Sequence, residues 1–238
     1  MKIFLIGYGR MGQLIEKTAV ASGDEIVGRF DADNFSALKT AGRADVAMDF
    51  SNPSSLPVLS EYIRRTGTPL LSGTTGFTDK NLADFAELGA YAPVLHSGNY
   101  SLGVAVFRKV LAQMTEVLGP EFDIEIVETH HNQKVDAPSG TALMLRDAVD
   151  PKHKKKLVYG REGSCGKRTQ NEIGIHSLRG GTVAGVHTVG FYGPDEEMEI
   201  THRAASRQIF ANGALHMARL LAAMPKGSYD LQELLFGK

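Results

Sequence analysis

The sequence predicts an α/β fold, with a Rossmann-like doubly wound parallel sheet and a smaller α+β domain that has an open mixed sheet. Three observations predict it. An apolar strand at 2–6 runs into a glycine-rich turn and then into a helical segment. Short apolar strands alternate with helical segments up to residue 101, which is typical of parallel sheets because each strand needs a crossover. From residue 122 onward, strands separated by glycine turns indicate a second sheet of a different kind.

The first turn has the spacing of a dinucleotide-binding loop. Residues 2–12 read KIFLIGYGRMG, which places Gly7, Gly9 and Gly12 in a G-x-G-x-x-G pattern. The first glycine permits a tight turn, the second lets the backbone approach a pyrophosphate, and the third allows close packing of helix and strand. The motif alone is weak evidence, because this spacing also occurs by chance. It predicts NADH, NADPH or both as the cofactor.

An acidic residue completes this pattern. The segment EIVGRF reads as a second strand that leads into Asp31, and Asp31 lies 19 positions after Gly12, close to the roughly 20 expected for the acid that binds the adenosine ribose. A carboxylate there accepts hydrogen bonds from the ribose hydroxyls and repels a 2′-phosphate. Ala32 follows, although Arg10 and Arg29 supply positive charge nearby. We therefore expect NADH to be used at least as well as NADPH.

The remaining elements of the first half follow from apolar runs and capping residues. Glycines after a strand, as at 73–76 (GTTG), suit the close approach of a ligand. We expect strands at 46–50 and 68–72, a helix through 61–65, a helix capped by Thr78, and a strand followed by a turn at 92–101.

The second half is predicted to begin with a long helix at 101–118, whose apolar stripe would be Val106, Val110, Met114 and Val117. A period-two strand follows at 122–128. Further strands are expected within 151–160, 171–181, 182–193 and 198–205, and a final helix at 206–224 returns to the first half. The predicted domains are therefore 1–101, completed by 208–238, and 102–207. A cleft at the two crossings is the expected place of a two-substrate site.

Residues 128–142, ETHHNQKVDAPSGTA, carry the densest cluster of ionisable groups. Ser139 is a good N-cap, and the start of a helix attracts anions, so two histidines and a lysine beside it predict a carboxylate or phosphate ligand next to a proton donor. A solvated basic loop is the alternative interpretation. Adjacent histidines in a strand point to opposite faces, and no spacing typical of metal ligands is present, so no metal is predicted.

Composition excludes several classes of protein. The chain has 238 residues, a formal net charge of -1 and one cysteine, which gives no argument for binding nucleic acid or a membrane surface and rules out an intrachain disulfide. The chain begins directly with a strand, and no apolar run approaches the roughly 18 residues of a membrane span. We expect a cytoplasmic protein.

With these residues assembled, the chain resembles the 4-hydroxy-tetrahydrodipicolinate reductase family, historically dihydrodipicolinate reductase, of bacterial lysine and diaminopimelate biosynthesis. The most specific segment is 128–142, which resembles the family signature E-x-H-H-x-x-K-x-D-A-P-S-G-T-A. The motifs GRMG, GTTG, SGNYSLGV and ITHRAASR…FANGA also match, in the same order along the chain. The resemblance covers essentially the whole chain.

The resemblance implies a role for each matching residue. Residues 1–101 would bind the cofactor, and 102–207 would bind a small dicarboxylate substrate and join a homotetramer through its sheet. The implied catalytic pair is His130 and Lys134. The implied substrate ligands are His131, Ser139, Gly140 and Thr141. The implied cofactor ligands are Gly7, Tyr8, Gly9, Arg10, Met11, Gly12, Asp31, Gly73, Thr74, Thr75, Ser97, Gly98, Asn99 and Tyr100.

Two departures from the family pattern bear on the cofactor. The first loop is one residue shorter than the usual form, and the arginine often found beside the acid is replaced by Ala32. Two alternatives remain at this point. Another nicotinamide dehydrogenase would keep residues 7–31 without needing the histidine-lysine-serine cluster, and a non-catalytic dinucleotide sensor would bind the cofactor without turnover.

Overall fold

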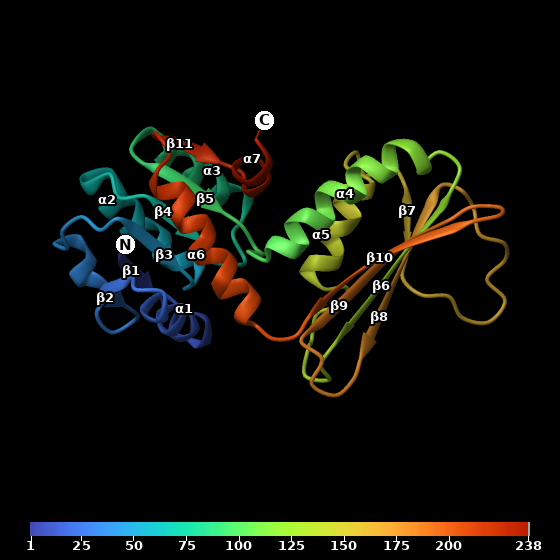
Figure 1. Ribbon diagram of the computed structural model, residues 1–238, viewed down its shortest axis with the longest axis horizontal. Helices are drawn as coiled ribbons and strands as arrows, with labels where there is room; N and C mark the ends of the chain where they lie inside the picture. Colours follow the sequence, from blue (N-terminus) through green and yellow to red (C-terminus); the bar gives the residue numbers. More distant parts are fainter. Residues whose placement is uncertain (238) are drawn as a thin grey trace. The chain divides into compact units, whose positions relative to one another are not determined.

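The computed structural model describes residues 1–237, and it divides the chain into two compact units. Unit 1 consists of Met1–Ser101 and Gln208–Lys238, and unit 2 consists of Leu102–Arg207. Figure 1 shows the elements of each unit. Among the described helices, none combines the length and hydrophobicity needed to cross a bilayer.

Unit 1 contains a six-stranded sheet in the order β11-β5-β4-β3-β1-β2, in which neighbouring strands of the described chain are parallel. The direction of winding changes at β1, which has β2 on one side and β3 on the other. Ligands of such sheets bind beyond the carboxyl ends of the strands at this point. The strands are β1 (Lys2–Ile6), β2 (Glu25–Phe30), β3 (Val46–Asp49), β4 (Leu70–Ser72), β5 (Pro93–His96) and β11 (Gly227–Tyr229).

Helices cover the sheet of unit 1. The core cluster on one face joins Phe4 and Ile6 of β1 to Leu59 and Ile63 of α2 and to Phe85 of α3. Thr78 caps α3, as expected, and accepts a hydrogen bond from the backbone of Asn81. The helices are α1 (Arg10–Ala21), α2 (Leu56–Thr66), α3 (Asp79–Glu87), α6 (Gln208–Ala222) and α7 (Leu231–Phe236), with short 3-10 turns at Phe35–Lys39, Pro53–Ser55 and Leu88–Ala90.

Unit 2 is a five-stranded mixed sheet in the order β10-β9-β6-β8-β7. Strand β6 is parallel to β8 and antiparallel to β9. Figure 1 shows α4 and α5 along one face of this sheet. The elements are α4 (Leu102–Leu118), β6 (Asp123–His130), α5 (Gly140–Val149), β7 (Lys156–Val158), β8 (Glu172–Arg179), β9 (Gly185–Tyr192) and β10 (Glu197–Ala204).

The strand expected at 122–128 extends to His130, and its burial alternates along its whole length. Ile124 and Ile126 lie in the core with Leu145 and Val149 of α5. Because side chains on one face recur every second residue, Glu128 and His130 continue this face beyond the apolar core. The alternation therefore places two ionisable side chains on the face of the sheet that α5 covers, at the carboxyl end of the strand.

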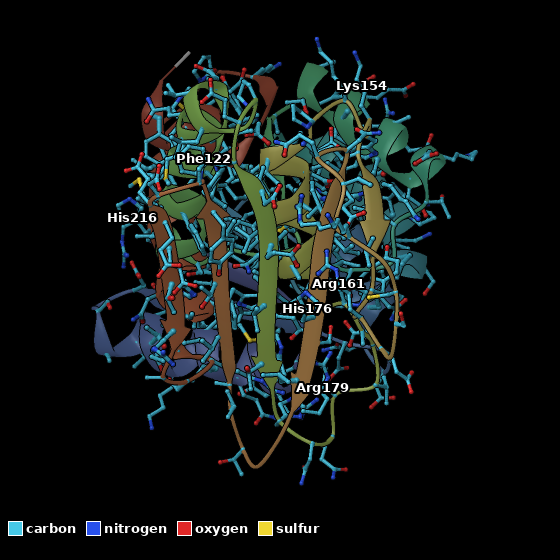
Figure 2. The ribbon with its side chains drawn as sticks, turned by 90° about the vertical axis from the view of Figure 1, so that its right-hand side faces the viewer. Phe122, Lys154, Arg161, His176, Arg179 and His216 are labelled. Atoms are coloured by element: carbon cyan, nitrogen blue, oxygen red, sulfur yellow. The ribbon has the colours of Figure 1, made fainter. Side chains whose placement is uncertain are left out.

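The other face of this sheet carries a charged network centred on Glu125. Its carboxylate accepts hydrogen bonds from Arg161, Arg168 and His176. Burial alone raises the pKa of Glu125, but these donors outweigh it and lower the pKa to about 2. Figure 2 shows Arg161 and His176 over this face. The network fastens the segment between β7 and β8 to the sheet.

The predicted stripe of the long helix is wrong at Val106 and Val117, although Met114 does pack against the core. In α4 the side chains buried against the core are Phe107 and Leu111, whereas Val106 and Val117 are exposed within the described chain. The helix has apolar residues around most of its circumference, so period 3.6 alone does not select the stripe that packs. Strand β11, at the edge of the first sheet, was not expected either.

Candidate active site

The loops expected to bind the cofactor lie at one edge of the unit 1 sheet. They follow β1, β2, β4 and β5, whose carboxyl ends meet there because the strands are parallel. Backbone hydrogen bonds join neighbouring loops to the strands, for example Gly7 N to Phe30 O, Gly73 N to Asp49 O and Ser97 N to Ser72 O. The topology thus brings together the segments 7–12, 73–75 and 97–100 and Asp31.

The glycine loop fits a dinucleotide. Gly7 has φ of 83°, in the left-handed region that favours glycine. A Cβ at Gly12 would overlap the carbonyl oxygen of Gly7, whereas a Cβ at Gly9 would meet no atom within 4 Å. Helix α1 begins with Gly9 as a cap that makes no side-chain hydrogen bond. The first-turn N–H groups therefore have no capping side chain, which suits a pyrophosphate.

Thr74 and Tyr100, both expected to bind the cofactor, use their side-chain hydroxyls within the protein. The Thr74 hydroxyl donates to the buried Asp49, which also accepts from Ser51 and Ser72. Burial raises the pKa of Asp49. The Tyr100 hydroxyl is buried and donates to the carbonyl oxygen of Ser72. Thr74 and Tyr100 therefore hold the loops after β3, β4 and β5, and these hydroxyls are already engaged.

In unit 2 the two adjacent histidines, His130 and His131, differ in position and exposure. His130 ends β6 and is 8% exposed, whereas His131 lies beyond the strand and is partly exposed. The expectation that at most one of the pair faces a given site agrees with this alternation. The ring of His130 meets that of His187 edge-on, with centroids 5.0 Å apart.

A fully buried carboxylate, Glu128, organises this end of the strand. One oxygen lies 2.5 Å from Nδ1 of His130, and the guanidinium of Arg179 donates to both oxygens, at 3.0 Å and 2.8 Å. The backbone N–H of Ser139 also donates to Glu128, at 3.3 Å. Burial raises the pKa of Glu128, but the hydrogen bonds, led by that from Arg179, outweigh it and lower the pKa. Glu128 is therefore an anion that holds three groups.

Helix α5 begins as the sequence predicted. Ser139 is its N-cap, with the hydroxyl accepting from Ala142 N at 3.1 Å and bonding to Nε2 of His187 at 3.0 Å. The Ser139 N–H donates to Glu128, which engages this group within the protein. Gly140, the first helical residue, is exposed, and a Cβ there would meet no atom within 4 Å. The exposed part of the helix start is therefore at Gly140.

Lys134 lies in the loop between β6 and α5. Its ammonium group is 2.8 Å from a carboxylate oxygen of Asp136, and its side chain is 20% exposed. The hydrogen bond from Lys134 lowers the pKa of Asp136. Arg179 donates to the carbonyl oxygen of Asp136, which ties the loop to the end of β8; Figure 2 shows Arg179 there. Lys134 is thus a supported but accessible cation beside the start of α5.

The donor atoms of Glu128, His130 and His187 lie within 4.8 Å of one another, a grouping that could hold a metal ion. The geometry around them opposes a cation, because the Arg179 guanidinium engages both Glu128 oxygens and Ser139 engages His187. These side chains fit a hydrogen-bonded anchor better than a metal centre.

Comparison with known proteins decides the family. Models of the dihydrodipicolinate reductase family match residues 1–100 for the N-terminal part and 103–235 for the C-terminal part. The chain belongs to the dihydrodipicolinate reductase family. It is therefore an NAD(P)H-dependent oxidoreductase, which removes the non-catalytic sensor as an interpretation.

Relatives support this membership over nearly the full length. A 4-hydroxy-tetrahydrodipicolinate reductase from Staphylococcus saprophyticus is 43% identical and one from Staphylococcus aureus strain MW2 is 45% identical, each over 98% of this chain and 100% of the relative. A dipicolinate-bound dihydrodipicolinate reductase from Paenisporosarcina sp. TG-14 has a TM-score of 0.79 at 23% identity, over 98% of both chains. A myo-inositol dehydrogenase from Sinorhizobium meliloti, with a TM-score of 0.61 at 10% identity over 94% of this chain and 88% of its own, shares the fold alone.

Two residues of this family member were not assigned from the sequence, Arg179 and His187. Each pairs with β6, because Arg179 lies opposite His130 in β8 and His187 lies opposite Glu128 in β9. The signal available was an arginine at the end of one predicted strand and a histidine inside another. Neither indicates the register that brings them to Glu128, which is set by contacts distant in sequence.

His187 gives the reductase an acid-sensitive site. Burial, with the neighbouring His130 as a second cause, lowers the pKa of His187 to about 4. Because the folded-state pKa lies below the unfolded value of about 6.5, the unfolded chain binds more protons between these pH values, and stability falls as pH decreases through that window. In urea unfolding, His187→Gln should remove up to about 3 kcal/mol of this pH dependence. An identical slope in both proteins between pH 6.5 and 4 would contradict the assignment.

Proposed function

We propose that this chain reduces 4-hydroxy-tetrahydrodipicolinate to tetrahydrodipicolinate with NADH or NADPH, in lysine and diaminopimelate biosynthesis. Unit 1 binds the cofactor through 7–12, Asp31, 73–75 and 97–100, and unit 2 binds the dicarboxylate substrate. The observation that carries the substrate assignment is the start of α5. Gly140 is exposed there, beside Lys134. Glu128 accepts the hydrogen bond of the Ser139 N–H and thereby fixes the surrounding loop.

A substrate carboxylate is favoured at this position for two reasons. The positive end of the α5 dipole and the N–H groups of its first turn, at Gly140 and Thr141, attract an anion. Lys134 adds a full positive charge, and His131 is partly exposed in the same loop. The Lys134 ammonium group is joined to Asp136 by one hydrogen bond. An anion that binds there therefore competes with Asp136 for this ammonium group.

The chemistry requires a proton as well as a hydride. Loss of water from the substrate gives a conjugated imine, and the bound cofactor supplies the hydride that adds at C4. The electron pair displaced onto the conjugated system then takes a proton. Lys134 can donate that proton or stabilise the negative charge that precedes it. His130 supports the site structurally, because Glu128 holds its Nδ1 and the ring is mostly buried.

A homotetramer in the cytoplasm, as the family resemblance implies, is part of this proposal. Its support is the open face of the unit 2 sheet, where α4 and α5 cover only the opposite side. Size-exclusion chromatography with light scattering would give about four times the 25.7 kDa chain mass if the tetramer forms.

Turnover of the authentic substrate tests the proposed function. The freshly made condensation product of pyruvate and aspartate semialdehyde should cause the nicotinamide absorbance to fall with NADH or NADPH. Pyridine-2,6-dicarboxylate should compete with this substrate. A protein that binds both cofactors but oxidises neither in the presence of the condensation product would contradict the proposal, whereas failure to bind either cofactor would indicate an inactive preparation.

A further inference from the structure

Three side chains form a closed cluster at the start of unit 1. Arg29 of β2 donates through Nε to Glu16 of α1 at 2.9 Å, and its Nη2 donates to the other Glu16 oxygen. The Tyr8 hydroxyl, from the glycine loop, also donates to Glu16. The guanidinium of Arg29 lies 5.8 Å from the centroid of the Tyr8 ring. Two hydrogen bonds in a fork, with an aromatic ring alongside, fix the guanidinium in one orientation.

The position of this cluster matters because Asp31 follows two residues after Arg29. Asp31 is exposed, and one of its carboxylate oxygens accepts from the backbone of Asp33. In this fold the acid beyond the second strand meets the adenosine ribose, and a nearby arginine accommodates a 2′-phosphate. Arg29 is the cation of β2 nearest to that acid, but its guanidinium already donates hydrogen bonds to Glu16.

The charges at this end of β2 determine whether a free ribose or a 2′-phosphate is favoured there. Hydrogen bonding from Arg29 lowers the pKa of Glu16 to about 2, so the carboxylate remains charged at neutral pH. Its charge cancels that of Arg29 and leaves Asp31 and Asp33 unopposed within the segment. A ribose with free hydroxyls suits this surface, whereas a 2′-phosphate would meet two carboxylates and a neutralised arginine.

We propose that Glu16 determines the cofactor preference of this enzyme by holding Arg29 away from the 2′-phosphate of NADPH. Glu16 itself contacts no part of the cofactor in this account. It is a residue that sets specificity through Arg29, and Tyr8 braces it. The proposal rests on the placement of the adenosine ribose at Asp31. Arg10, exposed at the first position of α1, is outside the cluster.

Direct binding measures this without relying on turnover. Nucleotide fluorescence would be titrated with the full-length chain, without substrate, to give Kd for NADH and for NADPH. Glu16→Gln keeps the side-chain shape and removes the charge, so the released Arg29 should improve NADPH binding relative to NADH by about tenfold or more. In the double variant Glu16→Gln with Arg29→Met, this gain should disappear.

A matched control removes the same charge elsewhere in unit 1. Glu87→Gln deletes a carboxylate paired with Arg64 at 3.7 Å and should leave the ratio of the two Kd values unchanged. Equal weakening of both cofactors in Glu16→Gln, or an unchanged ratio, would overturn the proposal. Asp31→Asn then separates the causes. If it shifts the ratio while Glu16→Gln does not, only the role of Glu16 fails; if neither shifts it, the ribose placement fails as well.

Discussion

Replacing Lys134 with methionine is expected to lower kcat by about 10²-fold or more, because the reaction loses the cation that donates the proton or stabilises the charge before protonation. The folded structure should survive this change, since the Lys134 side chain is partly exposed and forms its ion pair with the exposed Asp136. Methionine retains the length of the side chain and removes the charge. Steady-state kinetics with the authentic substrate measures both kcat and KM.

The division between kcat and KM distinguishes two roles for Lys134. A residue that acts only as a carboxylate anchor would raise KM with little change in kcat. That outcome would contradict a part in the chemical step while leaving the substrate position intact. Lys154→Met is a suitable control, because Lys154 is exposed in unit 2 and lies at the other end of the sheet from Arg179 in Figure 2. Its kinetics should match those of the unmodified chain.

Glu128→Ala is expected to cause the largest loss of stability, about 3–5 kcal/mol, since it removes a fully buried carboxylate and leaves the partly buried Arg179 charge without its partner. His130 Nδ1 and the Ser139 N–H would also lose their acceptor. Such a loss is a large part of the stability of a typical domain, about 5–15 kcal/mol. Urea unfolding monitored by circular dichroism would measure it.

A conservative variant keeps this prediction testable if the alanine form does not fold. Glu128→Gln retains one acceptor oxygen for Arg179 and should cost less, about 1–3 kcal/mol. It should still reduce kcat, because His130 and the loop carrying Lys134 lose their fixed support. Glu162→Gln, at an exposed position of the same unit, should change stability by no more than about 0.5 kcal/mol. An alanine form as stable as the unmodified chain would show that Glu128 is not the organising anion.

The parts of the fold and site that could be predicted from sequence are those with local signals. Gly7, Gly9 and Gly12 sit in the strand-turn-helix context that the spacing indicated, and Ser139 and Thr78 cap the helices that they were expected to cap. Each of these depends on residues within a few positions along the chain. Alternation along β6 likewise places Glu128 and His130 on the face of Ile124 and Ile126.

What the sequence could not predict depends on distant contacts. Arg179, which donates to Glu128, comes from β8, and His187, which bonds to Ser139, comes from β9. Both lie more than 50 residues further along the chain than Glu128, and only strand register brings them to this site. The hydrogen bond from the Ser139 N–H to Glu128 could not be predicted from the sequence for the same reason. The stripe of α4 was misassigned because several faces of that helix are apolar, and the packing partner selects among them.

We infer that unit 2 binds a small dicarboxylate at the start of α5, beside Lys134. A crystal structure with pyridine-2,6-dicarboxylate tests it most directly. We expect one carboxylate within hydrogen-bond distance of the Gly140 and Thr141 N–H groups, with the Lys134 ammonium group turned toward the ligand. A ligand seated away from residues 130–141, with that helix start occupied only by solvent, would contradict it.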